Sequence, residues 1–291
     1  MFTGSWVALV TPMDAEGRVD YDDLQRLVDF HIEAGTDGIV SVGTTGESAT
    51  LPFEEHINVV KKTVEFSAGK IPVIAGSGAN STAEAVFLSE QLQDTGIKGF
   101  LSVVPYYNKP QQRGMIEHFK AIAAATHLPN LLYNVPGRTS VDMLPETVAE
   151  LAKIDNIVGL KDATGDIQRL LDTQPLVPND FVMLSGDDDS SLAFLEKGGH
   201  GVISVTANIM PAEMAQMCQL TASGDITSAT AINDRIKALH TELFLEANPV
   251  IPKWALYKMG LIRTPKLRLP LVEPELVSQK QIEATLTSLS L

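Results

Sequence analysis

Short apolar runs alternate with helical patterns at nearly even spacing from the N-terminus to residue 206. Eight such runs recur, at residues 5–10, 37–43, 71–76, 99–104, 130–135, 157–160, 181–186 and 201–206. Between the runs, apolar residues return at helical spacing, as Leu24 and Leu27 do after the candidate N-cap Asp20. Because parallel strands buried on both faces have continuous apolar sequences, the pattern predicts a parallel sheet covered by helices.

Eight βα units are the number at which a parallel sheet closes on itself, so we predict a (β/α)8 TIM barrel. An open, doubly wound α/β sheet is the alternative. The even spacing disfavours the open sheet, and no G-x-G-x-x-G motif opens the first helix. GSGANS (76–81) supplies only G-x-G, and we interpret it as a tight turn. After residue 208 only helical patterns remain. We therefore predict a catalytic barrel at 1–224 and a C-terminal all-helical appendage at 225–291.

The charge balance and the single cysteine exclude several classes of protein. Acidic residues outnumber basic ones by 36 to 22, giving a net charge of −14. Nucleic acids and anionic membranes require clustered lysine and arginine, so neither is an expected partner. Cys218 can form no intrachain disulfide, and we find no secretory signal or membrane-spanning apolar run. We predict a cytoplasmic protein.

Barrels of this kind place their chemistry at the carboxyl ends of the strands. Lys161 ends the sixth run, where on its own a solvated surface lysine is the ordinary interpretation. The other strand ends carry hydroxyls and a guanidinium, which change that interpretation. The candidate site residues at these ends are Thr44, Thr45, Tyr106, Tyr107, Tyr133, Arg138, Lys161, Gly186, Asp187 and Ile203.

A lysine among hydroxyls and an arginine favours Schiff-base chemistry. An amine attacks a carbonyl only when it is neutral, and an apolar strand end favours the neutral form. The resulting iminium is an electron sink, and hydroxyls can relay its protons. The Gly-Thr-Thr-Gly turn at 43–46 could hold one carboxylate and Arg138 a second. This set predicts a class I aldolase or lyase that acts on a 2-keto acid.

No metal or other cofactor is predicted. Asp187, Asp188 and Asp189 are adjacent, but a cation would need further ligands from elsewhere, so we interpret them as helix N-caps. The six histidines form no pair at zinc-ligand spacing.

Six motifs, in order, resemble the dihydrodipicolinate synthase family. They are GTTGES (43–48), PYYNKP (105–110), YNVPGRT (133–139), GLKDATGD (159–166), SGDD (185–188) and GHGVISVTAN (199–208). The resemblance runs from FTGSWVALVTP at the N-terminus to NPVIPKWAL near residue 250. It implies that Lys161 forms the Schiff base with pyruvate and that Thr44, Tyr133 and Tyr107 relay protons, with Tyr107 supplied by a neighbouring subunit.

The resemblance also implies the two substrates and the assembly. Thr45 would contribute to the pyruvate carboxylate pocket, and Gly186 and Ile203 would line the site through their backbones. Arg138 would bind the carboxylate of L-aspartate 4-semialdehyde. The implied product is 4-hydroxy-tetrahydrodipicolinate, an intermediate of lysine and diaminopimelate biosynthesis. A dimer would be the smallest active unit, and a homotetramer built as a dimer of dimers is the expected state.

Many members of this family are inhibited allosterically by L-lysine at the dimer interface. The matching positions are Ser48, Ala49, His56, Asn80, Glu84 and Tyr106. Phe53 stands where sensitive bacterial members often have histidine. An aromatic ring can still pack on the aliphatic stem of lysine, so we expect weakened inhibition.

Two alternative functions remain open from the sequence. One is an N-acetylneuraminate lyase or 2-keto-3-deoxy-sugar-acid aldolase, which would use the same lysine and tyrosine. The other is a non-catalytic barrel that senses a small molecule. Tyr107 and Arg138 together favour the synthase.

Overall fold

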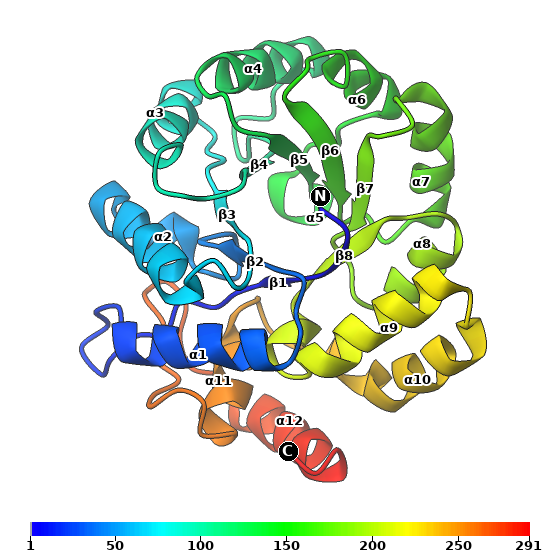
Figure 1. Ribbon diagram of the computed structural model, residues 1–291. Helices are drawn as coiled ribbons and strands as arrows, with labels where there is room; N and C mark the ends of the chain where they lie inside the picture. The colour runs from blue at the N-terminus through cyan, green and yellow to red at the C-terminus, as the bar shows by residue number, and fades with distance from the viewer. Residues whose placement is uncertain (1) are drawn as a thin grey trace.

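The computed structural model describes residues 2–291 and contains a closed parallel barrel (Figure 1). The eight strands pair in chain order, and the last pairs back with the first. They are β1 (Gly4–Ala8), β2 (Gly38–Ser41), β3 (Val73–Gly76), β4 (Phe100–Val103), β5 (Asn130–Asn134), β6 (Ile157–Asp162), β7 (Val182–Ser185) and β8 (Gly201–Ser204). The predicted TIM barrel is confirmed, and the open sheet is wrong.

A ring of helices surrounds the strands in Figure 1. Its helices are α1 (Tyr21–Glu33), α2 (Phe53–Ser67), α3 (Thr82–Leu92), α4 (Gln112–Ala124), α6 (Pro145–Leu151), α7 (Ile167–Thr173), α8 (Ser191–Glu196) and α9 (Pro211–Ser223). The first begins as predicted, because the Asp20 side chain accepts the N–H of Asp23. A short helix that the sequence pattern did not predict, α5 (Pro136–Thr139), follows β5.

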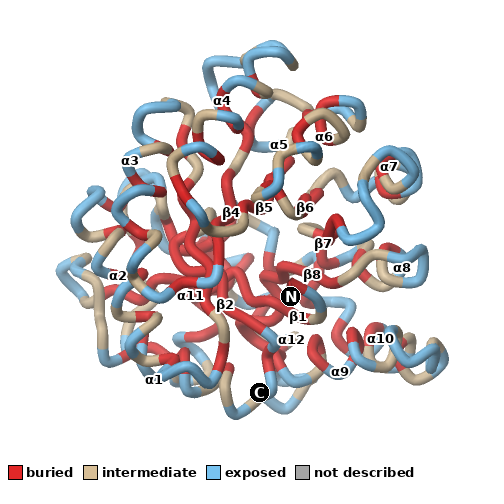
Figure 2. The backbone as a smooth tube through the Cα atoms, turned by 45° about the horizontal axis from the view of Figure 1, so that its top comes forward, coloured by how far each residue is buried: buried red, intermediate tan, exposed pale blue. Residues whose placement is uncertain are grey.

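Apolar side chains fill the barrel and the layer between strands and helices. Inside the barrel, one cluster contains Trp6, Val40, Ile74, Leu101, Leu131, Leu184 and Ile203, all at most 4% exposed. Figure 2 shows the strands as buried and the outward turns of the helices as exposed. The inner cluster therefore forms the floor below the polar residues at the strand ends.

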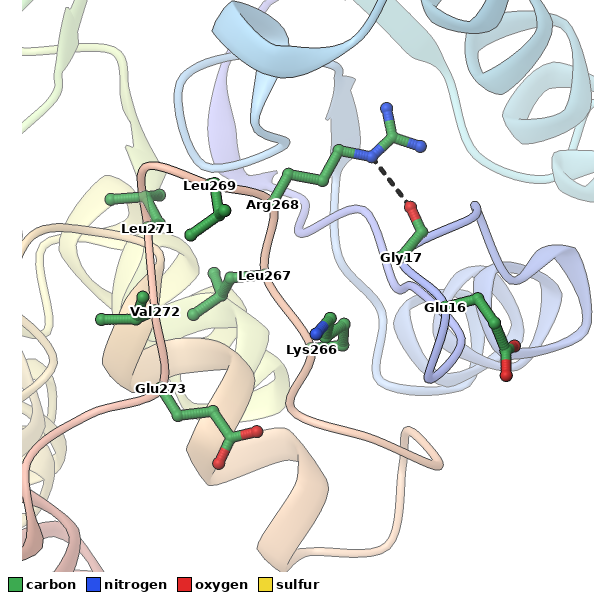
Figure 3. Close-up of a pocket in the computed structure, with 9 residues that line it drawn as sticks. All are labelled: Glu16, Gly17, Lys266, Leu267, Arg268, Leu269, Leu271, Val272 and Glu273. Carbon is green, nitrogen blue, oxygen red and sulfur yellow. Dashed lines mark hydrogen bonds between the residues drawn. The ribbon is translucent and has the colours of Figure 1, made fainter.

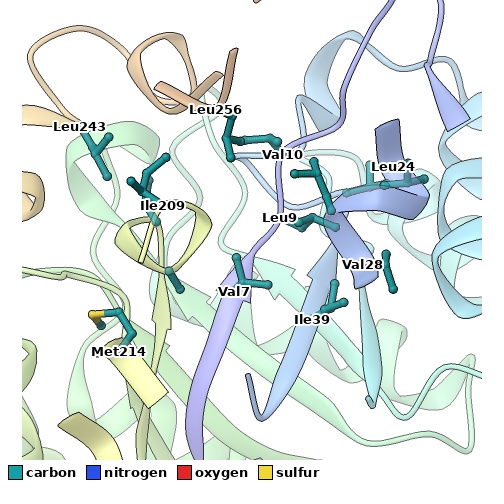
Figure 4. Packing of buried hydrophobic residues seen from close by; sticks show 14 of the residues in the cluster. Val7, Leu9, Val10, Leu24, Val28, Ile39, Ile209, Met214, Leu243 and Leu256 are labelled. Carbon is teal, nitrogen blue, oxygen red and sulfur yellow. The ribbon is translucent and has the colours of Figure 1, made fainter. Parts of the chain in front are cut away.

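The C-terminal helices are packed directly on the barrel. They are α10 (Ile226–Glu242), α11 (Val250–Lys258) and α12 (Leu276–Ser288). Leu243 and Leu256 belong to the same buried cluster as Val10 and Ile209 of the barrel, as Figure 4 shows. The predicted division at 224 and 225 coincides with the end of α9 at Gly224, and as a domain boundary it stays a prediction. None of the helices described in residues 2–291 is long and apolar enough to cross a membrane.

Candidate active site

Lys161 is the last but one residue of β6 and points into the barrel. Successive side chains of a strand face opposite sides, so Leu160 and Asp162 face the helices. The strand register pairs Lys161 with Tyr133 on β5 and with Leu184 on β7. Lys161 is only 5% exposed, and its Nζ lies 4.2 Å from the centre of the Tyr133 ring. Among the described residues, no carboxylate forms an ion pair with this amine.

A cavity of about 150 Å³ lies against this amine and is called the Lys161 cavity below. Seven of the residues predicted from the sequence line it: Thr44, Thr45, Tyr133, Arg138, Lys161, Gly186 and Asp187. They come from four different strand ends, which the closure of the barrel brings to one opening.

Gly186 makes room for the lysine side chain. A Cβ atom at this position would lie 2.6 Å from Cε of Lys161 and 2.9 Å from Cβ of Ala163. The Gly186 N–H donates to the Asp162 carbonyl at 2.7 Å, which keeps the backbone close. Any larger residue here would have to displace the lysine.

The turn at residues 43–48 presents two threonines to the cavity. The Gly43 carbonyl accepts the N–H groups of Gly46 and Ser48, and the Gly46 carbonyl accepts the Thr11 hydroxyl at 2.7 Å. The Thr45 hydroxyl accepts the side-chain amide of Asn248 at 2.9 Å. The turn is thus held both from within and by the C-terminal segment.

Arg138 lies in α5, at the rim of the cavity. Its Nη2 donates to the backbone carbonyl of Asn248 at 3.3 Å. No carboxylate among the described residues pairs with it, so the guanidinium is available to an anionic ligand.

A polar network on the outer face of the strands supports the two catalytic candidates. Asp162 accepts the Thr164 N–H and the Asn134 side-chain amide, each at 3.0 Å. The same amide donates to Asp142, which pairs with Arg169 at 2.6 Å. Asp162 and Asn134 directly follow Lys161 and Tyr133, so the network fixes the ends of both strands.

Three of the candidate residues lie outside the Lys161 cavity: Tyr106, which lines a second cavity described below, Tyr107 and Ile203. Tyr107 is 89% exposed with a φ of 74° and does not line the cavity of its own chain. Ile203 is buried in the inner apolar cluster, and Val205, two residues further on, lines the cavity in its place.

Two carboxylates of the acidic run at 187–189 accept backbone N–H groups, although Ser190, and none of these acids, is the N-cap residue of α8. The Asp187 carboxylate accepts the N–H and hydroxyl of Ser190, just before α8. The Asp188 carboxylate accepts the N–H groups of Val205 and Thr206, each at 2.9 Å. Asp187 also lines the Lys161 cavity. In the described part of the chain, no three histidines, cysteines or acids are grouped as metal ligands.

A second cavity of about 410 Å³, called the outer cavity below, adjoins the first and shares Thr44, Val135, Arg138 and Asn248 with it. Five of the six candidate lysine-binding residues line it: Ser48, Ala49, His56, Glu84 and Tyr106. Asn80 does not, and its carbonyl accepts the Asn108 amide at 2.8 Å. Phe53 lines the cavity, with its ring 5.6 Å from that of Phe87.

His56 has a fixed position in the wall of the outer cavity. Its Nε2–H donates to the Gly76 carbonyl at 2.8 Å. Burial lowers the pKa of His56 to about 4, so the ring is neutral at physiological pH.

Sequence reasoning missed both residues of the C-terminal segment that line the Lys161 cavity, Phe244 and Asn248. Both follow α10, far from any strand end. The NPVIPKWAL motif, which begins at Asn248, was the only signal near them.

Comparisons with known proteins agree with this geometry. A model of the dihydrodipicolinate synthetase family matches residues 1–289. A Pseudoalteromonas atlantica protein named 4-hydroxy-tetrahydrodipicolinate synthase is 67% identical over 283 residues, covering 97% of each chain.

Solved structures are equally similar in fold. The chloride-inhibited dihydrodipicolinate synthase from Acinetobacter baumannii, complexed with pyruvate, has 46% identity and a TM-score of 0.97, covering 100% of this chain and 99% of its own. A dihydrodipicolinate synthase (DHDPS) from Cyanidioschyzon merolae with lysine bound has 38% identity and a TM-score of 0.95, covering 99% of this chain and 98% of its own.

Proposed function

The chain belongs to the dihydrodipicolinate synthetase family, and from that premise we propose that it condenses pyruvate with L-aspartate 4-semialdehyde through a Schiff base on Lys161. It is a lyase of the class I aldolase type. One observation carries the assignment of Lys161. This buried amine faces the Tyr133 ring and the Lys161 cavity, and no carboxylate among the described residues pairs with it.

The first half of the reaction forms the covalent intermediate. The neutral Nζ attacks C2 of pyruvate to give a carbinolamine, which loses water to become an iminium. A proton then leaves C3 and the electron pair moves to nitrogen, giving an enamine. Tyr133 is the neighbouring hydroxyl on the adjacent strand, and we assign it the proton transfers, with Thr44 next in the relay.

The second half joins the two substrates. The enamine carbon attacks the aldehyde carbon, which forms the new C–C bond and leaves an alkoxide that takes up a proton. The amino group of the second substrate then attacks C2 of the iminium and releases the Lys161 amine, which closes the ring of 4-hydroxy-tetrahydrodipicolinate. Thr45 would bind the carboxylate from pyruvate, and Arg138 the carboxylate from the aldehyde.

The relay in this proposal includes Tyr107 from a second copy of the chain. Its side chain is 89% exposed and lies outside its own Lys161 cavity. Phe53 and Leu269 expose apolar surface, and a proline next to Leu269 lines the outer cavity with Phe53. A partner covering this face would bury the apolar surface, which supports a dimer and, by extension, the dimer of dimers.

Trapping tests the mechanism. Treatment with pyruvate and borohydride should add one reduced pyruvate to the chain, at Lys161, and the Lys161→Ala variant should gain none. Absence of an adduct on the native protein would reject the Schiff base. Turnover with L-aspartate 4-semialdehyde should exceed turnover with sugar aldehydes, and the reverse result would favour the sugar-acid aldolase.

We also propose that L-lysine inhibits the enzyme from the outer cavity. Glu84 can bind an ammonium group there, and Phe53 can pack on the aliphatic stem. Lysine titrated into the assay should lower turnover, and Phe53→His should strengthen the inhibition. Unchanged turnover at millimolar lysine in both proteins would reject this site. The proposed reaction uses no metal or cofactor, and the cytoplasm remains the proposed location.

A further inference from the structure

A fully buried ion pair joins two motifs that the proposed reaction leaves unused. Glu47 ends the sequence GTTGE, and Lys253 is the lysine of NPVIPK. Lys253 Nζ lies 2.7 Å from Glu47 Oε1, and their side chains are 0% and 1% exposed. Burial lowers the pKa of Lys253, and the adjacent Glu47 carboxylate opposes that effect.

Glu47 is fixed at both carboxylate oxygens and in an unusual backbone conformation. Its φ is 58°, in the left-handed region that non-glycine residues rarely adopt. Its second oxygen accepts the backbone N–H of Arg268 at 3.0 Å. Arg268 is itself anchored through Nε to the Gly17 carbonyl, as Figure 3 shows, and its guanidinium pairs with Glu55. Three separate segments therefore meet at this carboxylate.

Asn248 connects the ion pair to the Lys161 cavity. It stands just before α11, the helix that carries Lys253. Its side-chain amide donates to the Thr45 hydroxyl at 2.9 Å, and its backbone carbonyl accepts from Arg138 at 3.3 Å. One residue thus contacts both groups assigned to the substrate carboxylates.

We propose that Glu47 and Lys253 are positioning residues that set both carboxylate-binding groups at once, because they fix Asn248 relative to the turn at 43–48. This inference rests on the proposed function for the identity of the two anionic substrates.

The energetics favour positioning over simple stabilisation. Desolvating two charges costs about as much as their attraction returns, and well-packed apolar residues of similar size are often equally stabilising. A buried pair with a residue at positive φ is therefore a poor device for stability alone. The ion pair does fix the orientation of the two side chains, because a charged hydrogen bond permits few geometries.

The double variant Glu47→Leu with Lys253→Met separates the two roles. It keeps the side-chain volume and removes both charges, while the Arg268 N–H loses its acceptor, so the melting temperature should fall less than in Lys253→Ala, which leaves a charge unpaired. The KM values for pyruvate and for L-aspartate 4-semialdehyde should both increase, by about tenfold to a hundredfold. Native KM values for both substrates in the folded double variant would overturn the proposal.

A single variant should separate the two contacts of Asn248. Asn248→Ala removes the amide that holds Thr45 but keeps the carbonyl that holds Arg138, so only the KM for pyruvate should rise. If the double variant does not fold, Glu47→Gln provides the same test, since it keeps the size and weakens the pair. For Glu47→Gln, an increase in only one of the two KM values, or in neither, would overturn the proposal.

Asp23→Asn is the matched control. The Asp23 side chain is also 0% exposed and pairs with Arg26 and Arg263, away from the Lys161 cavity. It should lower the melting temperature without changing either KM. If the native protein does not condense pyruvate with L-aspartate 4-semialdehyde, the proposed function is wrong. The effect of the ion pair on pyruvate binding can still be measured in that case, by borohydride trapping at a series of pyruvate concentrations.

Discussion

Lys161 and Lys253 are both buried but have different surroundings. Lys253 in α11 is 0% exposed and lies 2.7 Å from the Glu47 carboxylate. Lys161 in β6 is 5% exposed, and its amine lies 4.2 Å from the centre of an aromatic ring, beside a cavity. The Lys253 amine is held by a buried carboxylate, whereas the Lys161 amine has no carboxylate partner among the described residues and lies beside a cavity that a substrate can enter. The partner decides whether a buried lysine serves structure or chemistry.

We expect different results when each lysine is replaced by alanine. Lys161→Ala should lower turnover by about 10⁴-fold or more, because the covalent route is lost. Its free energy of unfolding should stay within about 1 kcal/mol of the native value, because no buried carboxylate loses a partner. Steady-state kinetics and urea unfolding measure both quantities. If Lys161→Ala retained its turnover, Lys161 would not be the nucleophile.

Lys253→Ala should lower stability in addition to raising both KM values. It leaves the Glu47 carboxylate buried without its cation, which typically costs about 3–5 kcal/mol of unfolding free energy. Urea unfolding monitored by circular dichroism gives this value. A loss below about 1 kcal/mol would show that Glu47 finds another partner or takes up a proton.

Gly186→Ala tests how much room the reactive lysine needs. The added methyl group would lie 2.6 Å from Lys161 Cε, so the amine must move and kcat should fall by about a hundredfold. Gly114→Ala in α4 is the control, since its nearest contact would be an ordinary 3.6 Å. Equal kcat values in the two variants would contradict the close contact at Lys161.

His31 extends the comparison to a buried base without a carboxylate partner. It is 0% exposed, and burial lowers its pKa to about 3. As the pH falls below about 6.5, the unfolded chain takes up the proton first. The unfolding free energy should therefore fall by about 1.4 kcal/mol per pH unit from this group between pH 6.5 and 3. His31→Gln should remove that part of the slope in urea unfolding at a series of pH values.

The barrel and the central site residues were predictable because their signals are local. Continuous apolar runs mark strands buried on both faces, and Lys161 and Tyr133 stand at the ends of two such runs. The turn at 43–48 and the N-cap at Asp20 also depend on neighbouring residues. Asp187 was predicted to be a helix N-cap, but Ser190 is the N-cap residue of α8, and the Asp187 carboxylate accepts the Ser190 N–H just before that helix.

Contacts between distant parts of the chain were not predictable. Asn248 and Phe244 reach the Lys161 cavity only because helices α10 and α11 pack on the barrel, and no strand pattern encodes that packing. That Val205 lines the cavity was also not predicted, because it lies just beyond the end of β8, whereas the backbone role of Ile203 stays a prediction. Whether Tyr107 completes the relay depends on a second chain.

The attachment of the active site to the C-terminal segment affects how the enzyme is made. Glu47 and Lys253 are 206 residues apart, and Asn248 must arrive before Thr45 receives its hydrogen bond. When a ribosome has completed all eight strands, at residue 204, neither contact exists. The hydrogen bond and the ion pair that hold the turn at 43–48 can therefore form only after residue 253 has left the ribosome.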